Sequence, residues 1–484
     1  MNIVDNILYQ CRYHAPVAAM GAPGTALNVV SYGRLERFIH NVSRKAVATG
    51  LSRGQIVAIF VMDPVLHAVI ILGLTRLGVI TLSGRNPRLP RELGVAALIT
   101  DTDFPYEAAK IVRVDQSWLA GDGNPVADAR VYHTDADDIC RIVLTSGTTG
   151  DAKAVALTHR MMAARVARHD TVFGNLLPQS SRTFCDLGLA TSLGFQFLVY
   201  MLWRGGTIFF PGYSIEHGVR ALDAYRVQNM ISAPSGLAQH LRFYQDRRPL
   251  QCSLEMILSA GSLLSGALST RVRARMCANV VSLYGSTEAS MIAVAPAHEL
   301  AHLSGAVGYI LPDVAVEIAD PSGRALPAGT EGVVRIRSPY SPGEYLGAPA
   351  ESAKAFAGGW FYPGDIGRLT ADRLLVITGR EKDVMNLGGD KVKPEMVEEV
   401  VASFSGIDQV AVFSVPNELG IEEIWSLIAP ISQRDEAALR AHCQEKLPPA
   451  FVPVRFIAVQ SLPRNAMGKI ERHRLQDIAK TSMH

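Results

Sequence analysis

A loop rich in glycine and small polar residues, LTSGTTGDAKAV, lies between an apolar run and a predicted helix at residues 157–168. Its backbone amides, its hydroxyl groups and the ammonium group of Lys153 could together bind a phosphate group. Glycines let the backbone of such a loop approach a ligand closely. The triple-phosphate pattern GxxxxGK[ST] is not met, because Lys153 does not directly follow a glycine and is followed by Ala154. A polar, glycine-rich loop is also typical of an exposed turn, so the loop alone leaves both interpretations open.

Four further segments contain residues that could do chemistry. They are YGSTEAS at 284–290, GWFYPGDIG at 359–367, GREKDVMNLGGDKV at 379–392 and PRNAMGKI at 463–470. Taken singly, their aromatic and acidic residues are typical of packing, capping and turns, and their lysines are typical of a solvated surface. In kind and in order, the five segments resemble the motifs of the acyl-activating, adenylate-forming superfamily. That superfamily includes acyl- and aryl-CoA synthetases, adenylation domains of peptide synthetases and firefly luciferases.

The resemblance implies that ATP is a substrate and assigns residues to it. The β- and γ-phosphates would be bound by the first loop, through Thr145, Ser146, Gly147, Thr148, Thr149, Gly150 and Lys153. The adenine would lie between Tyr284 with Gly285 on one side and Ala260 with Gly261 on the other. Asp365 would accept hydrogen bonds from both ribose hydroxyls, a task suited to the two oxygens of a carboxylate, and Arg380 would also reach the ribose.

The resemblance also implies three catalytic residues, Lys469, Thr287 and Glu288. Lys469 would bridge the attacking carboxylate and the α-phosphate and offset negative charge in the transition state. Thr287 would contact the α-phosphate, and Glu288 would bind Mg²⁺, which prefers carboxylate and phosphate oxygens. The implied reaction has two steps. A carboxylic acid and ATP give an acyl-adenylate and pyrophosphate, and a thiol then gives a thioester and AMP.

A mobile C-terminal domain follows from the same resemblance. Residues 1–381 would form the N-terminal domain that binds ATP and the acid, and residues 382–484 the domain that carries the catalytic lysine. Lys382 would be the hinge, and Gly388 and Gly389 would let a pantetheine arm pass in the second step. The expected thiol is CoA, and the alternative is the phosphopantetheine of an acyl or peptidyl carrier protein.

The acid itself would bind in a mostly apolar pocket of small side chains. The residues assigned to it are Ala190, Thr191, Gly194, Phe195, Ala233, Ser235 and Met291, with Gly261 nearby. The segment GLATSLGFQF contains no acid that could anchor a substrate amine, and Asp186 lies too early. We therefore expect an aliphatic or aromatic acid without an α-amine.

Several positions depart from the usual motifs, although none removes a group assigned to chemistry. Ala154 places a Cβ close to the expected phosphate path, and Pro363 and Asn465 stand where threonine is common. Two rival functions remain. A phosphotransferase would release ADP and leaves PRNAMGKI unexplained. A non-catalytic binding protein would have lost Lys153, Glu288, Asp365 or Lys469, and all four are present.

The elements that position these residues follow from the hydrophobic pattern of the 484-residue chain, which is 48% hydrophobic. Continuous apolar strands, as at 55–61, 79–82 and 96–100, alternate with helical patterns at 32–49 and 64–78. This alternation predicts an α/β fold with parallel-type sheets. Alternating strands after about residue 305 predict an antiparallel, β-barrel-like subdomain, and an α/β pattern then returns in a small C-terminal domain.

Composition limits the partners. The net charge of +2 is dispersed, so we expect no nucleic-acid partner. The longest apolar region is interrupted by Asp63, Pro64, His67 and Arg76, so no membrane span is expected. A cytoplasmic protein is the expectation, and a homodimer is left open.

Overall fold

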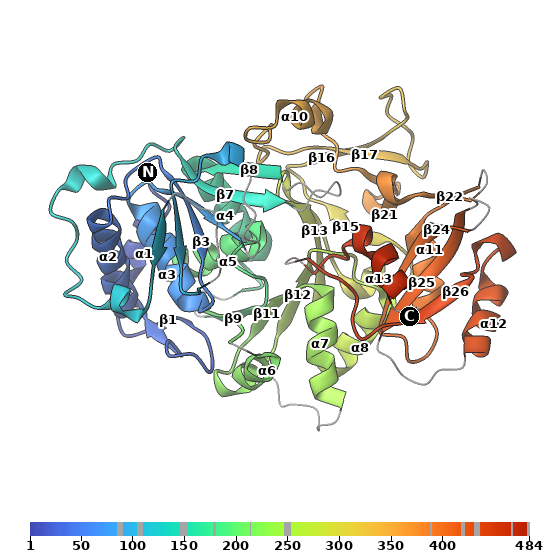
Figure 1. The fold of residues 1–484 in the computed structure, drawn as a ribbon, viewed down its shortest axis with the longest axis horizontal. Coiled ribbons are helices and arrows are strands. Elements are labelled where there is room, and N and C mark those ends of the chain that lie inside the picture. Colours follow the sequence, from blue (N-terminus) through green and yellow to red (C-terminus); the bar gives the residue numbers. More distant parts are fainter. Residues whose placement is uncertain are drawn as a thin grey trace.

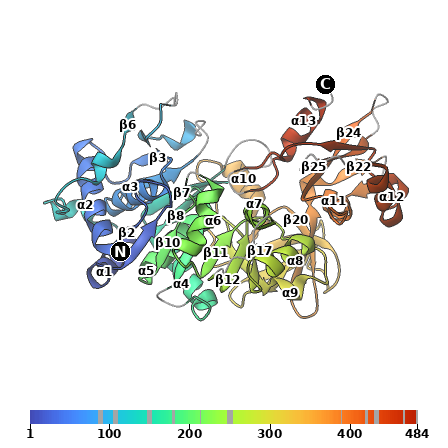
Figure 2. The ribbon, with the colours of Figure 1, turned by 90° about the horizontal axis from the view of Figure 1, so that it is seen from below.

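The computed structural model describes residues 1–84, 91–103, 110–145, 153–177, 181–212, 214–245, 253–387, 390–417, 422–429, 436–465 and 468–481. A large body contains two extended sheets, and a smaller C-terminal lobe lies beside it (Figure 1, Figure 2). None of the helices in the described part of the chain combines the length and the apolar character needed to cross a membrane.

The first sheet has six strands. Their order is β6 (Ile111–Arg113), β5 (Ala97–Thr100), β3 (Ile56–Phe60), β4 (Ile80–Ser83), β7 (Ile139–Thr145) and β8 (Lys153–Thr158). Neighbouring strands are parallel except for the antiparallel pair β7 and β8. Three helices accompany this part of the chain, α1 (Val4–Tyr13), α2 (Tyr32–Ala48) and α3 (Pro64–Arg76). The strands and helices predicted for this region are confirmed.

The segments on either side of the glycine-rich loop pair as antiparallel strands, whereas the sequence suggests a strand before the loop and a helix after it. Thr145 at the end of β7 pairs with Lys153 at the start of β8. Val155 and Leu157 of β8 are fully buried, so this segment packs as a strand. Helix α4 (His159–Phe173) begins only after Thr158, whose hydroxyl accepts a hydrogen bond from the Met161 amide. The positive end of a helix dipole therefore does not directly follow the loop.

The second sheet has fifteen strands and carries most of the predicted site. Its parallel part runs in the order β1 (Ala18–Gly21), β10 (Thr207–Phe209), β9 (Arg182–Cys185), β11 (Asn229–Ser232), β12 (Met256–Ala260) and β13 (Val280–Ser286), with β2 (Val30–Ser31) antiparallel to β1 at the edge. The helices that connect these strands are α5 (Ser192–Trp203), α6 (Ile215–Ala224), α7 (Pro234–Gln245) and α8 (Gly266–Arg275). This is the parallel α/β arrangement that the sequence predicts.

Beyond β13 the same sheet continues with antiparallel strands. They are β14 (Ser290–Pro296), β15 (Ala306–Ile310), β21 (Leu374–Arg380), β20 (Asp365–Leu369), β17 (Gly332–Arg337), β19 (Trp360–Phe361) and β18 (Phe356–Ala357), with β16 (Ala315–Ala319) paired to β17. Two short helices lie in this region, α9 (Ala297–Leu300) and α10 (Pro349–Ala355). The predicted antiparallel character is confirmed. The described strands form no closed barrel, because β14 joins this part to the open parallel sheet.

The C-terminal lobe has a hairpin, a three-stranded sheet and helices. The hairpin consists of β22 (Met385–Leu387) and β23 (Asp390–Val392), and the sheet of β24 (Gln409–Pro416), β25 (Glu422–Ala429) and β26 (Arg455–Ala458). The helices are α11 (Pro394–Ala402), α12 (Glu436–Lys446) and α13 (Leu475–Thr481). The α/β pattern predicted for this region is confirmed, and the boundary at residue 381 stays a prediction.

Charged pairs join the lobe to the large body. Lys393 at the start of α11 contacts Glu331, with 2.6 Å between Nζ and Oε2, and donates a hydrogen bond to Thr378. On another side, Asp408 accepts from Arg271 of α8 at 2.8 Å. These contacts come from separate elements of the large body and belong to the orientation of the lobe seen here.

A buried arginine ties the first sheet to the loop before α5. Arg141 of β7 is fully buried, and its guanidinium donates hydrogen bonds to the Leu189 carbonyl at 2.6 Å and to Thr81 at 3.3 Å. It also lies 4.7 Å from the ring centroid of Phe195. Burial lowers the pKa of Arg141 to about 9. The side chain therefore positions the beginning of α5, where four of the predicted pocket residues lie.

We predict that Arg141→Ala lowers the free energy of unfolding by about 2–4 kcal/mol, because it leaves a cavity and an unpaired Leu189 carbonyl. Arg141→Met fills most of the volume without a buried charge and should cost less. Urea denaturation followed by circular dichroism measures both variants. Equal stability of Arg141→Ala and the unaltered chain would contradict this role.

Candidate active site

The turn between β13 and β14 places two predicted residues inside the protein. Tyr284 lies at a bulge of β13, and Thr287 and Glu288 follow in the turn, 5% and 8% exposed. A Cβ at Gly285 would lie 2.5 Å from the Ser290 carbonyl oxygen, so the close approach of the two strands requires glycine there. This local geometry directs the Glu288 carboxylate inward.

Strand register brings Asp365 and Arg380 together. They are the first residue of β20 and the last residue of β21, and they are directly paired. Arg380 Nε lies 3.1 Å from Asp365 Oδ1, and the Tyr284 hydroxyl donates to Asp365 Oδ2. Burial and the Asp365 carboxylate raise the pKa of Tyr284 well above its usual value, so this hydroxyl stays protonated and can donate. Three residues assigned to adenine and ribose therefore form one cluster.

Lys469 reaches the same cluster from the C-terminal lobe. Its amide donates to the side-chain oxygen of Asn465 at 3.0 Å, and the Asn465 amide donates to the Lys469 carbonyl at 2.9 Å. Asparagine in place of the usual threonine thus stabilises this turn. Gly468 has φ +75°, and a Cβ there would lie 2.3 Å from Ser235 Oγ. The turn therefore packs tightly on the first turn of α7.

The charges around Lys469 come from the large body. Burial and then the Arg380 guanidinium lower the pKa of Lys469, whereas the Asp365 and Glu288 carboxylates act in the opposite direction. The ammonium group is thus placed among the residues assigned to ribose and to the metal, although it lies more than 80 residues away from each of them in the sequence.

A second cluster surrounds Lys153 on the side of the phosphate loop. Its Nζ lies 3.3 Å from Glu351 Oε2 and 4.8 Å from the ring centroid of Tyr345. The Tyr345 hydroxyl donates to Glu288 Oε1 at 3.0 Å. Ala154, expected to crowd the phosphate path, is instead 4% exposed within an apolar cluster that includes Ile142. The Ala154 side chain therefore contributes to an apolar cluster of the first sheet.

The predicted pocket residues lie in different surroundings. Ala233 and Ser235 contact the Gly468 turn, so they lie next to Lys469. Thr191 caps α5, and a Cβ at Gly194 would lie 2.6 Å from the Gly188 carbonyl oxygen. Phe195 is 1% exposed beneath Arg141.

The four remaining predicted residues are Ala190, Met291, Ala260 and Gly261, and the last three lie on or beside the second sheet. Ala190 immediately precedes the α5 cap and is partly buried. Met291 of β14 is 2% exposed and its carbonyl accepts from Arg168. Ala260 ends β12 beside β13, and Gly261 follows with φ +100°. Both are thus placed near Tyr284, as expected for the adenine side.

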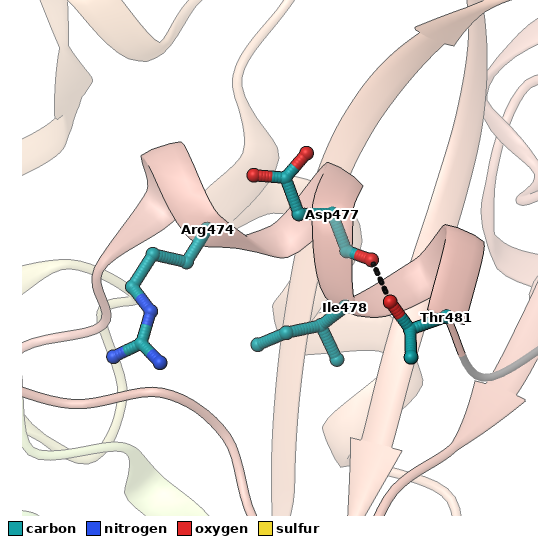
Figure 3. Close-up of a pocket in the computed structure, with 4 residues that line it drawn as sticks. All are labelled: Arg474, Asp477, Ile478 and Thr481. Atoms are coloured by element: carbon teal, nitrogen blue, oxygen red, sulfur yellow. Dashed lines mark hydrogen bonds between the residues drawn. The ribbon is translucent and has the colours of Figure 1, made fainter.

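Some predicted residues cannot be placed. Ser146, Gly147, Thr148, Thr149 and Gly150 of the loop, and Gly388 and Gly389 of the pantetheine path, lie outside the described residues. Lys382 is exposed in a short turn between β21 and β22. A surface hollow of about 290 Å³ on α13 is lined by Arg474, Asp477, Ile478 and Thr481, with Ile478 and Thr481 side by side (Figure 3). None of its lining residues belongs to the predicted site.

The structure adds Tyr345, Glu351 and Arg165 to the residues found by sequence reasoning. Tyr345 lies in the turn segment YSPGEYLG, and Glu351 in the short helix α10, so neither belongs to a recognisable motif. Arg165 of α4 is fully buried, and burial lowers its pKa to about 10, partly offset by the Glu288 carboxylate. The sequence of an amphipathic helix does not reveal which residues of other elements surround a buried arginine.

Comparison with known proteins decides the family. Residues 14–346 match the AMP-binding enzyme family, and residues 396–469 match the AMP-binding enzyme C-terminal domain. The chain belongs to the AMP-binding enzyme family. The predicted superfamily and class, an AMP-forming acid–thiol ligase, are thereby confirmed, and the family's two matched regions include three of the five motifs in full or in part.

Relatives within the family activate different acids. A 2-hydroxy-7-methoxy-5-methyl-1-naphthoate–CoA ligase of Streptomyces carzinostaticus is 30% identical over 363 residues, which cover 71% of this chain and 63% of that relative. A fatty acid–[acyl-carrier-protein] ligase of Streptomyces coeruleorubidus is 26% identical over 98% of this chain and 96% of its own length. The crystal structure of an anthranilate CoA ligase in complex with anthranoyl-AMP superposes with a TM-score of 0.84, at 22% identity, over 100% of this chain and 98% of the other. That likeness shows the fold.

The lowered pKa of Lys469 predicts how activity depends on pH. If the ammonium form is required, kcat/KM for ATP falls as pH rises through a value below the ordinary lysine pKa of 10.5, because kcat/KM reports ionisations of the free enzyme. Lys469→Arg keeps its charge to higher pH and should lose this alkaline decline, and Lys469→Ala should lose most activity. If kcat/KM of Lys469→Arg declines with the same midpoint pH as that of the unaltered enzyme, the ionisation belongs to another group.

Proposed function

We propose that this enzyme activates an aliphatic or aromatic carboxylic acid as an acyl-adenylate and transfers the acyl group to the thiol of CoA. The observation that supports it most is the placement of Lys469. This partly buried lysine of the C-terminal lobe lies within the electrostatic influence of Asp365 and Glu288, which the family motifs assign to ribose and metal. A kinase-like use of the phosphate loop would not need this lysine.

In the first step a carboxylate oxygen of the acid forms a bond to the α-phosphorus of ATP, and the bond from that phosphorus to the bridging oxygen breaks. Pyrophosphate leaves with the electron pair. Lys469 would lie between the carboxylate and the α-phosphate and offset the charge that develops there. Lys153 would contact the departing phosphates from the other side, next to the loop that Thr145 and Lys153 close.

Mg²⁺ fits the residues present if it arrives with ATP. Among the described residues no group of three or more His, Cys, Asp or Glu side chains could hold a metal ion alone. Mg²⁺ is typically bound with nucleotides by one or two carboxylates plus phosphate oxygens, and the inward-facing Glu288 supplies such a carboxylate. When bound, the ion would neutralise charge on the phosphate oxygens.

The acid would bind beside Ala233 and Ser235, under the Lys469 turn. A substrate amine would need an acidic partner there, and Asp186 is already engaged: its Oδ2 accepts from Ser232 Oγ at 2.7 Å and lies 3.5 Å from His240 Nε2. An acid without an α-amine therefore remains our proposal.

In the second step the sulfur of the thiol bonds to the acyl carbon, and AMP leaves from the mixed anhydride. Rotation of the C-terminal domain about Lys382 would withdraw Lys469 from the site and bring the segment at Gly388 and Gly389 to it. A carrier protein is the second candidate acceptor, because the fatty acid–[acyl-carrier-protein] ligase aligns over nearly the whole chain.

The test is to measure pyrophosphate and AMP released from Mg·ATP across a panel of aliphatic and aromatic acids, first without a thiol, then with CoA, then with phosphopantetheinylated carrier protein. We expect acid-dependent pyrophosphate, a thioester only when CoA is added, and loss of both in Lys469→Ala. A thioester that forms only on the carrier protein would show that the carrier protein, and not CoA, is the acceptor. Release of ADP, or no release with any acid, would contradict the proposal.

A further inference from the structure

Tyr345 lies between two groups of the proposed site that come from different sheets. The face of its ring lies 4.8 Å from Lys153 Nζ, where a cation is attracted to the aromatic ring. Its hydroxyl donates to Glu288 Oε1 at 3.0 Å. Lys153 begins β8 in the first sheet, and Glu288 lies in the β13–β14 turn of the second sheet. One side chain therefore spans the gap between the two groups.

The surroundings of Tyr345 hold it in place. The residue is 6% exposed, its amide donates to Ser352 Oγ at 2.9 Å, and its ring packs against that of Phe356. The next amide, of Leu346, donates to the Ala154 carbonyl at 2.8 Å and so ties this segment to β8. A carboxylate can only accept, so the Tyr345 hydroxyl is the donor in its bond to Glu288.

The groups that Tyr345 touches are also held from their far sides. Lys153 forms an ion pair with Glu351 at 3.3 Å. The charge of Glu288 acts on the buried guanidinium of Arg165, which donates twice to the Tyr340 carbonyl. Fixing Oε1 of Glu288 fixes the plane of its carboxylate and hence the direction of the other oxygen.

We propose that Tyr345 is a positioning residue that couples Lys153 to Glu288, the ring face setting the place of the ammonium group and the hydroxyl setting the orientation of the carboxylate. The inference rests on the proposed function, in which Lys153 binds the terminal phosphates and Glu288 binds the Mg²⁺ that those phosphates carry. A single rigid side chain would then keep the two at the separation that Mg·ATP requires.

The chain offers a matched control in Tyr340. Its ring also lies beside a cation, 4.6 Å from the Arg168 guanidinium, and its hydroxyl also donates to a carboxylate, Asp313 Oδ2 at 2.7 Å. Neither Arg168 nor Asp313 belongs to the proposed site. Loss of the hydroxyl at residue 340 removes the same kind of bond without touching Glu288.

The test measures ATP binding by isothermal titration calorimetry on the full chain, without any acid, at a series of Mg²⁺ concentrations. Tyr345→Phe keeps the ring for Lys153 and removes the bond to Glu288. We expect its ATP affinity to fall on the order of tenfold at saturating Mg²⁺, its half-saturating Mg²⁺ concentration to rise, and its affinity without Mg²⁺ to stay unchanged. Tyr345→Leu should weaken binding under both conditions, and Tyr340→Phe under neither.

A double-mutant cycle separates positioning from general stability. If the hydroxyl acts through the carboxylate, Tyr345→Phe should have no further effect on Mg²⁺ dependence in a Glu288→Gln background. Incorporation of 4-aminophenylalanine at residue 345 restores a hydrogen-bond donor, so it should restore the Mg²⁺ dependence of the unaltered chain. This variant also tests the inference if Tyr345→Phe does not fold. Unchanged Mg²⁺ dependence in Tyr345→Phe, or additive effects in the cycle, would overturn the inference. Failure of the proposed function would give a different result: the unaltered chain would bind ATP but release no pyrophosphate with any acid.

Discussion

The site depends on bringing one positive charge from the far end of the chain into a partly desolvated position. Removing an ammonium group from water is costly unless opposite charges offset the loss, and Lys469 is influenced by Asp365 and Glu288 in this sense, against the opposing charge of Arg380. The Gly468 turn that carries the lysine packs closely on the start of α7. The ion pairs of Lys393 with Glu331 and of Arg271 with Asp408 hold the C-terminal lobe where this packing is achieved.

The receiving groups are placed by strand geometry. The direct pairing of β20 with β21 puts Arg380 beside Asp365, and the bulge at Tyr284 turns its hydroxyl toward the same carboxylate. On the phosphate side, the β7–β8 hairpin brings Lys153 to Tyr345 and thus to Glu288. Two sheets therefore meet in one site with positive groups at its ends and carboxylates between them, an arrangement suited to a nucleotide with its metal ion.

Sequence reasoning found the groups with a fixed local spacing and missed those that only the fold brings close. The motifs named Tyr284, Asp365 and Lys469, which the structure brings together, and the apolar pattern predicted the parallel strands. Tyr345 was missed because a tyrosine in a turn has no periodic or motif signal, and its partners in the site, Glu288 and Lys153, are 57 positions away or more. Periodicity did not reveal that β8 follows the loop, because its last two residues, Leu157 and Thr158, also fit the helical pattern that continues into α4. It also could not reveal that the antiparallel strands extend an open sheet. Whether a side chain such as Phe195 faces a pocket or a buried arginine depends on packing between sheets, which no local pattern encodes.

The central claim is that Lys469 stabilises transfer of the α-phosphoryl group of ATP to a carboxylate. Exchange of isotopically labelled pyrophosphate into ATP, measured with a carboxylic acid and without any thiol, tests this step alone because the exchange requires reversible formation of the acyl-adenylate. The account predicts acid-dependent exchange in the unaltered enzyme and its loss in Lys469→Ala, with ATP still bound. Exchange that persists undiminished in Lys469→Ala would contradict the account.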